Sequence, residues 1–180
     1  MKPSSSSALA VAVAVLAVAA EATIESTCQE AAARDRRVDV RFCAREFTAY
    51  HGADEADPWG LAKAAALIGV NLGDDAVYDI GSGKVRPPRG AGGRRARDAM
   101  AACAEAYDAA GTAFAEASDE LGARRYAAAR QELARVAALV QRCDGGLARA
   151  GARTPRALAR YSNECQQMAI IGIAITDLIK

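Results

Sequence analysis

The stretch of sequence that decides the fold is residues 100–143, which read MAACAEAYDAAGTAFAEASDELGARRYAAARQELARVAALVQRC. Apolar side chains recur in it at spacings of three and four, the pattern of amphipathic helices. The two apolar rows are Met100, Cys103, Tyr107, Ala110, Phe114, Ala117 and Leu121, followed by Tyr126, Ala129, Leu133, Val136, Val140 and Cys143. Gly122 suits a left-handed helix C-cap. We therefore place a turn near Ala123 and predict an antiparallel helical hairpin.

Four of the five cysteines are arranged symmetrically about predicted turns. One pair is equidistant from the turn near Ala123, and the other flanks a polar break at Asp35. A helix folded back at such a turn brings its two cysteines side by side, so we predict the disulfides Cys28–Cys43 and Cys103–Cys143. Closing their loops is worth about 3 and about 4 kcal/mol in the chain-entropy model. Cys165 remains, and on the apolar row of the last segment it is expected to be a buried free thiol.

A capping residue followed by proline indicates the start of each of two further helices. Asp57 precedes Pro58, and Thr154 precedes Pro155, which we expect at the first helical position. The apolar rows that follow are Trp59, Leu61, Ala65, Ile68 and Leu72, and then Leu158, Tyr161, Cys165, Met168, Gly172, Ile175 and Ile179. Glycine and proline in residues 81–93 separate the first bundle helix from the second. The expected fold is all-α: a helical hairpin over residues 23–56, then an antiparallel four-helix bundle over residues 57–180, with two disulfides.

The N-terminus has the composition of a secretory signal. Lys2 and a serine run precede the apolar stretch Ala8–Ala20, and Ala20-Glu21-Ala22 fits a small-x-small cleavage site. We expect residues 1–22 to be removed and residues 23–180 to form a secreted, soluble domain, in keeping with disulfides that need an oxidising compartment. The net charge of +1 gives no global reason to expect a polyanionic partner.

The sequence offers little catalytic chemistry. His51 is the only histidine, and at the end of the predicted hairpin it is interpreted as a surface capping residue. No serine lies in a G-x-S-x-G elbow, and no Glu-x-x-His or Cys-x-x-Cys pair is present to bind a metal. We therefore predict a protein that is not an enzyme and that uses no cofactor or metal, and whose surface binds a partner.

Several motifs, in this order and spacing, resemble a known family. They are Thr23–Cys28, Phe42-Cys43, Trp59–Ala62, Ala102–Ala109, Val136–Cys143 and Tyr161–Cys165 with its continuation to Thr176. Together they resemble the plant invertase and pectin methylesterase inhibitor family over residues 23–180, and the spacing between Cys28 and Cys43 resembles its pollen-allergen-like subgroup. The resemblance implies a helical hairpin joined to a four-helix bundle, with the first cysteine bonded to the second and the third to the fourth.

Within this family, the residues before the third bundle helix separate two target classes. Invertase inhibitors resemble one another in a Pro-Lys-Phe motif there, whereas this chain has Arg124-Arg125-Tyr126. The resemblance therefore favours an apoplastic inhibitor of pectin methylesterase that covers the enzyme's active-site cleft in a one-to-one steric complex. The alternatives are an inhibitor of cell-wall or vacuolar acid invertase and a non-inhibitory interaction protein on the same fold. The candidate contact residues are Glu116, Asp119, Glu120, Arg124, Arg125, Tyr126 and Arg130.

A basic run crosses the glycine-rich segment into the second bundle helix. Its members are Lys84, Arg86, Arg89, Arg94, Arg95 and Arg97. One interpretation is weak attraction to an anionic polymer such as wall pectin, and the other, which we take as the default, is a solvated loop. Nucleic acid is not expected as a partner, because a chain with 5% aromatic residues is a poor stacking platform.

Overall fold

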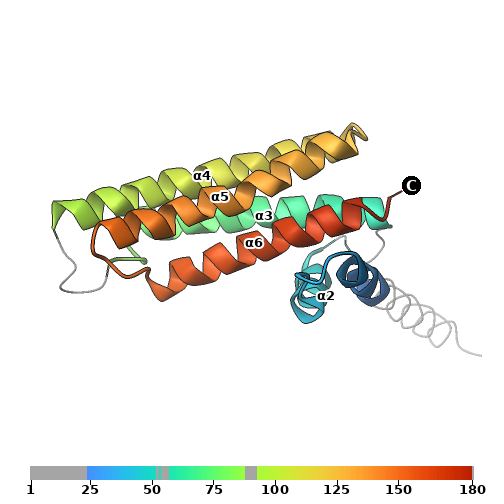
Figure 1. Ribbon diagram of the computed structural model, residues 1–180, viewed down its shortest axis with the longest axis horizontal. Helices are drawn as coiled ribbons and strands as arrows, with labels where there is room; N and C mark the ends of the chain where they lie inside the picture. The colour runs from blue at the N-terminus through green and yellow to red at the C-terminus, as the bar shows by residue number, and fades with distance from the viewer. Residues whose placement is uncertain (1–23, 52, 54–56, 88–92, 180) are drawn as a thin grey trace, which may run out of the picture.

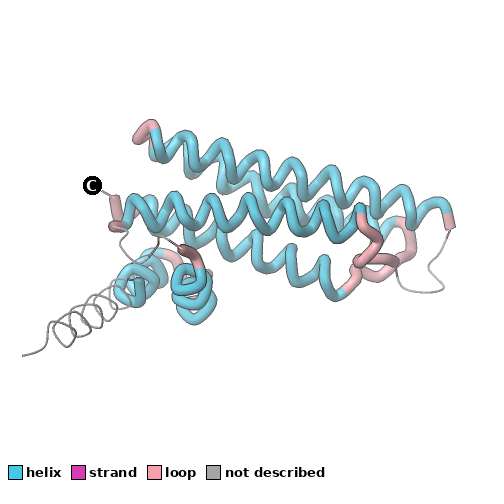
Figure 2. Tube along the Cα trace, turned by 180° about the vertical axis from the view of Figure 1, so that it is seen from behind, coloured by secondary structure: helices cyan, strands magenta, loops and turns pink. Residues whose placement is uncertain are grey.

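A computed structural model describes residues 24–51, 53, 57–87 and 93–179. Residues 24–34 are helical. The remaining helices are α2 (Val40–Ala49), α3 (Pro58–Gly81), α4 (Arg94–Gly122), α5 (Tyr126–Arg149) and α6 (Arg156–Thr176). In Figure 1 the long helices α3 to α6 lie alongside one another, and the hairpin formed by residues 24–34 and α2 packs against one end of them. Figure 2 shows the same arrangement from behind, with helices joined by loops throughout the described residues. The predicted all-α fold is confirmed.

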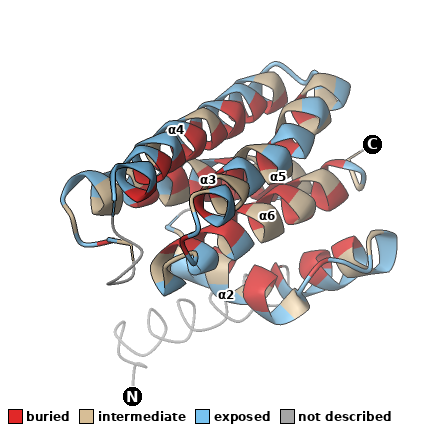
Figure 3. Ribbon diagram, turned by 60° about the vertical axis from the view of Figure 1, so that its left-hand side comes forward, coloured by how far each residue is buried: buried red, intermediate tan, exposed pale blue. Residues whose placement is uncertain are grey.

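The core lies between the four long helices, and Figure 3 shows their buried faces turned toward one another. The apolar rows of α4 and α5 are buried along nearly their whole length, as the periodicity predicts. Tyr107 lies at the centre with 0% exposure. Its hydroxyl donates to the carbonyl oxygen of Leu158 at 2.9 Å, which satisfies the polar end of a buried aromatic side chain. Burial raises the pKa of the Tyr107 phenol well above its usual range.

Glycines allow α3 to lie unusually close to α4. A Cβ atom added at Gly69 would lie 2.4 Å from ring atoms of Phe114, and one added at Gly73 would lie 3.0 Å from the Cα atom of Gly111. The spacing of apolar residues in the sequence does not predict this contact. A close approach also occurs at Gly172 of α6, where an added Cβ would lie 3.0 Å from Cδ1 of Leu133.

Two disulfides join the residues that the mirror symmetry predicts. In the Cys28–Cys43 bond the Cα atoms are 5.9 Å apart, and in the Cys103–Cys143 bond they are 4.4 Å apart. The first closes the hairpin, and the second fixes α4 against α5. Cys165 is free and buried.

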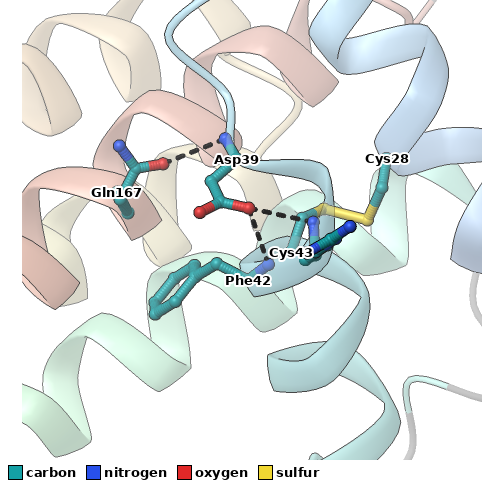
Figure 4. Close-up of a disulfide and its surroundings, with 6 residues drawn as sticks. Cys28, Asp39, Phe42, Cys43 and Gln167 are labelled. Carbon is teal, nitrogen blue, oxygen red and sulfur yellow. Dashed lines mark hydrogen bonds between the residues drawn. A yellow bond between two sulfur atoms is a disulfide. The ribbon is translucent and has the colours of Figure 1, made fainter.

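Polar contacts attach the hairpin to the bundle beside the first disulfide (Figure 4). The carboxylate of Asp39 caps α2 by accepting from the backbone N–H groups of Arg41 and Phe42 at 3.0 and 3.1 Å. The backbone N–H of Asp39 donates to Oε1 of Gln167 on α6 at 3.2 Å, and Nε2 of Gln167 donates to the carbonyl oxygen of Arg37 at 3.2 Å. A single amide side chain therefore bonds the turn of the hairpin to α6.

Polar contacts also join the helices at the other end of the bundle. The Tyr161 hydroxyl of α6 donates to the Asp79 carboxylate of α3 at 2.9 Å, and the Lys84 ammonium lies 3.0 Å from the same carboxylate. Lys84 and Tyr161 hold the pKa of Asp79 below its usual value. The Asp144 carboxylate of α5 accepts from the hydroxyls of Thr154 and Ser162, each at 3.1 Å.

Two predicted helix ends are wrong in detail. Gly122 is the last residue of α4 and does not take the left-handed conformation, which belongs to Arg124 at φ 60°. Pro155, not Thr154, is the N-cap of α6, because the Thr154 hydroxyl is engaged by Asp144 instead of the helix. The prediction for Asp57 is confirmed, since its carboxylate accepts from the N–H of Gly60 at 2.8 Å.

Part of the glycine-rich segment is described. α3 continues to Gly81, and Gly83 in the turn after it has φ 74°. Residues 88–92, which include Arg89 of the basic run, lie outside the described residues, as do residues 1–22 of the predicted signal. No helix within the described ranges has both the length and the apolar character that a membrane span requires.

Candidate functional site

The turn between α4 and α5 is held by backbone hydrogen bonds on both sides of Arg124. The N–H of Ala123 donates to Asp119 O at 2.9 Å, that of Arg124 to Leu121 O at 3.0 Å, and that of Arg125 to Glu120 O at 2.8 Å. The last carbonyls of α4 are thus satisfied although no glycine takes the left-handed position. A left-handed arginine is disfavoured relative to glycine, so surrounding contacts must compensate.

Trp59, at the start of α3, supplies those contacts. Its indole N–H donates to the Leu121 carbonyl at 2.8 Å, and the Arg124 guanidinium carbon lies 4.3 Å from the centre of its ring. The Lys63 ammonium also lies over this ring, at 5.1 Å. Arg124 in turn donates to the Tyr126 hydroxyl at 3.2 Å. The Trp59 ring therefore holds the Arg124 side chain in a turn that lies more than sixty residues further along the chain.

The apolar pattern of the sequence predicts Trp59 on the core-facing row of α3 and does not connect it with the turn. The structure leaves it half-buried, with its indole N–H bonded to the end of α4. The available signal was the pair Trp59 and Lys63, four residues apart and so on one helix face. Spacing alone could not indicate which distant segment the ring would meet.

The predicted contact residues fall into two groups by exposure. Glu116, Asp119, Arg124 and Arg125 are exposed, whereas Glu120, Tyr126 and Arg130 are half-buried. Arg124 and Tyr126 meet as described, and Nη2 of Arg125 donates to the Glu120 carboxylate at 2.9 Å. This last pair lowers the pKa of Glu120 and raises that of Arg125, through their hydrogen bond.

Two of the predicted residues lie away from the turn cluster. Arg130 forms an ion pair with Asp177 beyond α6 at 3.1 Å, and Glu116 pairs with Arg135 of α5 at 3.3 Å. The turn therefore presents a compact surface made of Trp59, Lys63, Glu120, Arg124, Arg125 and Tyr126, which we call the turn surface. Such pre-organised aromatic and arginine side chains are the types that dominate binding energy at protein interfaces.

Outside the turn surface, the described residues offer little that would support catalysis. Burial raises the pKa of the Cys165 thiol to about 12, so it is unsuited to nucleophilic attack. His51 is exposed. Within the residues that the structure describes, no group of three metal-ligating side chains is close enough to hold an ion. A groove of about 210 Å³ between α2 and α3, which includes Glu46, Tyr50 and Asp75, is smaller than small-molecule sites of roughly 300–1,000 Å³.

Comparison with known proteins assigns the family. Residues 22–175 match the family described as plant invertase/pectin methylesterase inhibitor. A protein of Oryza sativa subsp. japonica named pectinesterase inhibitor 8 is 44% identical over 159 residues, which cover 88% of this chain and 84% of that protein. Another from the same organism, named pectinesterase inhibitor 12, is 37% identical over 163 residues, covering 91% of this chain and 77% of that protein. This chain belongs to the plant invertase/pectin methylesterase inhibitor family.

Proposed function

We propose that the protein inhibits pectin methylesterases. The observation that carries this proposal is the similarity to two proteins named pectinesterase inhibitors, which extends over more than three quarters of each of them. The family is named for inhibition of enzymes, and the protein acts in the same way, as a binding partner and not as a catalyst. The buried, high-pKa state of Cys165 is consistent with that role.

Inhibition is steric in this proposal. A rigid bundle laid over the substrate cleft of the esterase, one inhibitor to one enzyme, excludes the polymer without making or breaking a bond. The turn surface supports such a role, because Trp59 holds Arg124 in place before binding. A contact that is ordered in the free protein costs less conformational entropy when the complex forms.

The alternative target, acid invertase, is named in the family description but in neither of the two relatives' names. The resemblance associates invertase inhibition with Pro-Lys-Phe, and Arg124-Arg125-Tyr126 has no proline and bears two cationic side chains. Arg124 occupies a left-handed conformation at φ 60°, which proline, with φ fixed near −65°, cannot adopt. The turn would have to change its backbone path to present the invertase motif at that residue. The pollen-allergen-like subgroup stays a prediction.

The proposed site of action is outside the cell, in the apoplast and cell wall. Residues 1–22 act as the signal segment in this proposal, and the inhibitor domain covers residues 23–180. Two observations support it. The family match begins at residue 22, and the Cys28–Cys43 and Cys103–Cys143 disulfides belong to an oxidising compartment.

A binding experiment tests the proposal. The disulfide-bonded protein is mixed with a plant pectin methylesterase, and the complex is sized by gel filtration with light scattering. We expect a one-to-one complex that the double variant R124A/R125A forms at least about tenfold more weakly, the loss typical of one interface hot spot. The matched control is R34A/R36A, two exposed arginines of the hairpin, which should bind like the unmodified protein. Absence of any complex would favour the non-inhibitory alternative.

A further inference from the structure

The end of the bundle opposite the turn surface carries a group of exposed arginines. They are Arg94, Arg95, Arg97, Arg149, Arg153 and Arg156, here called the basic end. The first three begin α4, Arg149 ends α5, and the last two lie in the connection to α6 and at its first residue. Figure 1 shows these three helix ends together at the end of the bundle away from the C-terminus. The Cys103–Cys143 disulfide sets α4 level with α5, so Arg97 and Arg149, each six residues from its half-cystine, lie at the same level of the bundle.

The charge of the basic end is poorly compensated. In the described part of the chain, no ion pair involves any of its six arginines. The nearby carboxylates are Asp79, Asp98 and Asp144. Asp79 is paired with Lys84, and Asp144 accepts two hydroxyl hydrogen bonds, so Asp98 is the one of these three that can offset part of the charge of six arginines. The whole chain has a net charge of only +1, so attraction of a polyanion to this end would come from the local grouping of arginines and not from the net charge of the molecule.

Helix stability does not account for this placement. α4 has arginines at its first, second and fourth residues, no acidic residue in its first turn, and no side-chain cap. Cations at a helix N-terminus oppose the helix dipole. Arg156 repeats the arrangement at the start of α6, again with no acidic residue in the first turn and no side-chain cap. Only Arg149, at the C-terminal end of α5, carries a charge that the helix dipole favours.

We propose that the basic end binds polygalacturonate, the carboxylate-bearing polymer that pectin becomes when its methyl esters are hydrolysed. Each guanidinium presents a planar fork that matches one carboxylate. A single exposed ion pair contributes little, but a repeating polyanion engages several arginines at once, so weak contacts add through multivalency. Among the described residues, no guanidinium of the basic end lies over an aromatic ring, so the basic end suits a polymer of carboxylates better than stacked bases.

The choice of this polyanion rests on the proposed function, since an esterase inhibitor works where de-esterified polymer accumulates. The geometry permits both contacts together. At 1.5 Å per residue, α4 separates the basic end from the turn surface by about 40 Å. The protein can thus bind the enzyme through one end and the reaction product through the other, which localises the inhibitor at wall regions that the esterase has already modified.

Retention on immobilised polymer tests this inference without any enzyme, so its failure is separable from failure of the proposed inhibition. The disulfide-bonded chain is applied at low salt to polygalacturonate, to fully methyl-esterified pectin and to heparin, and is eluted with a salt gradient. We expect retention on polygalacturonate and flow-through on the esterified polymer, because only the former carries charge. The retention should disappear with rising salt as the ionic contacts are screened.

Two triple variants locate the site. R94Q/R95Q/R97Q should bind polygalacturonate about tenfold more weakly, the combined effect of three exposed ion pairs. R34Q/R36Q/R41Q removes the same charge from exposed arginines of the hairpin and should elute with the unmodified protein. Equal losses in both variants would show a net-charge effect and overturn the proposal. So would flow-through of the unmodified protein on polygalacturonate, equal retention on esterified pectin, or retention on heparin alone.

Discussion

The close contact between Gly69 and Phe114 predicts that Gly69→Ala lowers the free energy of unfolding. In Gly69→Ala the new methyl group would lie 2.4 Å from Cδ1 and Cε1 and 2.5 Å from Cγ of the Phe114 ring. That ring has 0% exposure and is enclosed by the core, so it cannot rotate into solvent. Overpacking of this kind costs about 1–3 kcal/mol, whereas alanine in a helix interior gains about 1 kcal/mol over glycine. We expect a net loss of about 1 kcal/mol.

The assay is urea unfolding of the disulfide-bonded protein, followed by far-ultraviolet circular dichroism. Gly81→Ala is the matched control, because it lies on the same helix with nothing within 4 Å of its added Cβ, and it should be neutral or slightly stabilising. The double variant G69A/F114L should recover part of the loss, since leucine removes ring atoms from the site of overlap. If G69A is as stabilising as G81A, the close approach of α3 to α4 is not as described.

Three further predictions concern single side chains. Arg124→Gly should change the free energy of unfolding by no more than about 0.5 kcal/mol, because release of the left-handed strain offsets the lost ring contact. The same variant should weaken esterase inhibition, whereas the control Ala123→Gly should not. Equal inhibition by both variants would show that Arg124 is not in the interface. Because the native pKa of Asp79 is lowered, its contribution to stability is present above its unfolded pKa of about 3.9 and is lost as the pH falls below that value. Acid unfolding should therefore be less steep in Asp79→Asn than in the exposed control Asp74→Asn, and parallel curves would contradict the assignment. Cys165 should react with a thiol reagent only in denaturant, since burial raises its pKa to about 12; rapid labelling of the native protein would show that the thiol is accessible.

The four-helix architecture could be predicted because local signals agreed with one another. The apolar rows of residues 100–121 and 126–143 fixed two helices, and the mirror positions of Cys103 and Cys143 gave their register. Asp57 and Pro58 marked the start of α3, where the carboxylate indeed caps the helix. Each of these features depends on neighbours along the chain or on a symmetric turn, which a sequence displays directly.

The contacts that escaped prediction depend on pairs of distant residues. Nothing in the sequence indicates that Gly73 meets Gly111, or that the Trp59 indole meets the end of α4. The intrinsic preference of glycine predicts Gly122 as the left-handed residue of the turn, but tertiary contacts place Arg124 there. The predicted contact residues include Glu116 and Arg130, which lie away from the turn surface. Their position on an outward helix face can be predicted from the sequence, but their ion-pair partners Arg135 and Asp177 cannot.

The central claim is inhibition of pectin methylesterase, and a paired activity assay tests it most directly. The disulfide-bonded protein is titrated into a plant pectin methylesterase and, separately, into a plant acid invertase, both at mildly acidic pH. The account predicts that esterase activity falls in proportion to added protein, with an end point at one inhibitor per enzyme, while invertase activity is unchanged. Inhibition of invertase alone, or of neither enzyme, would contradict it.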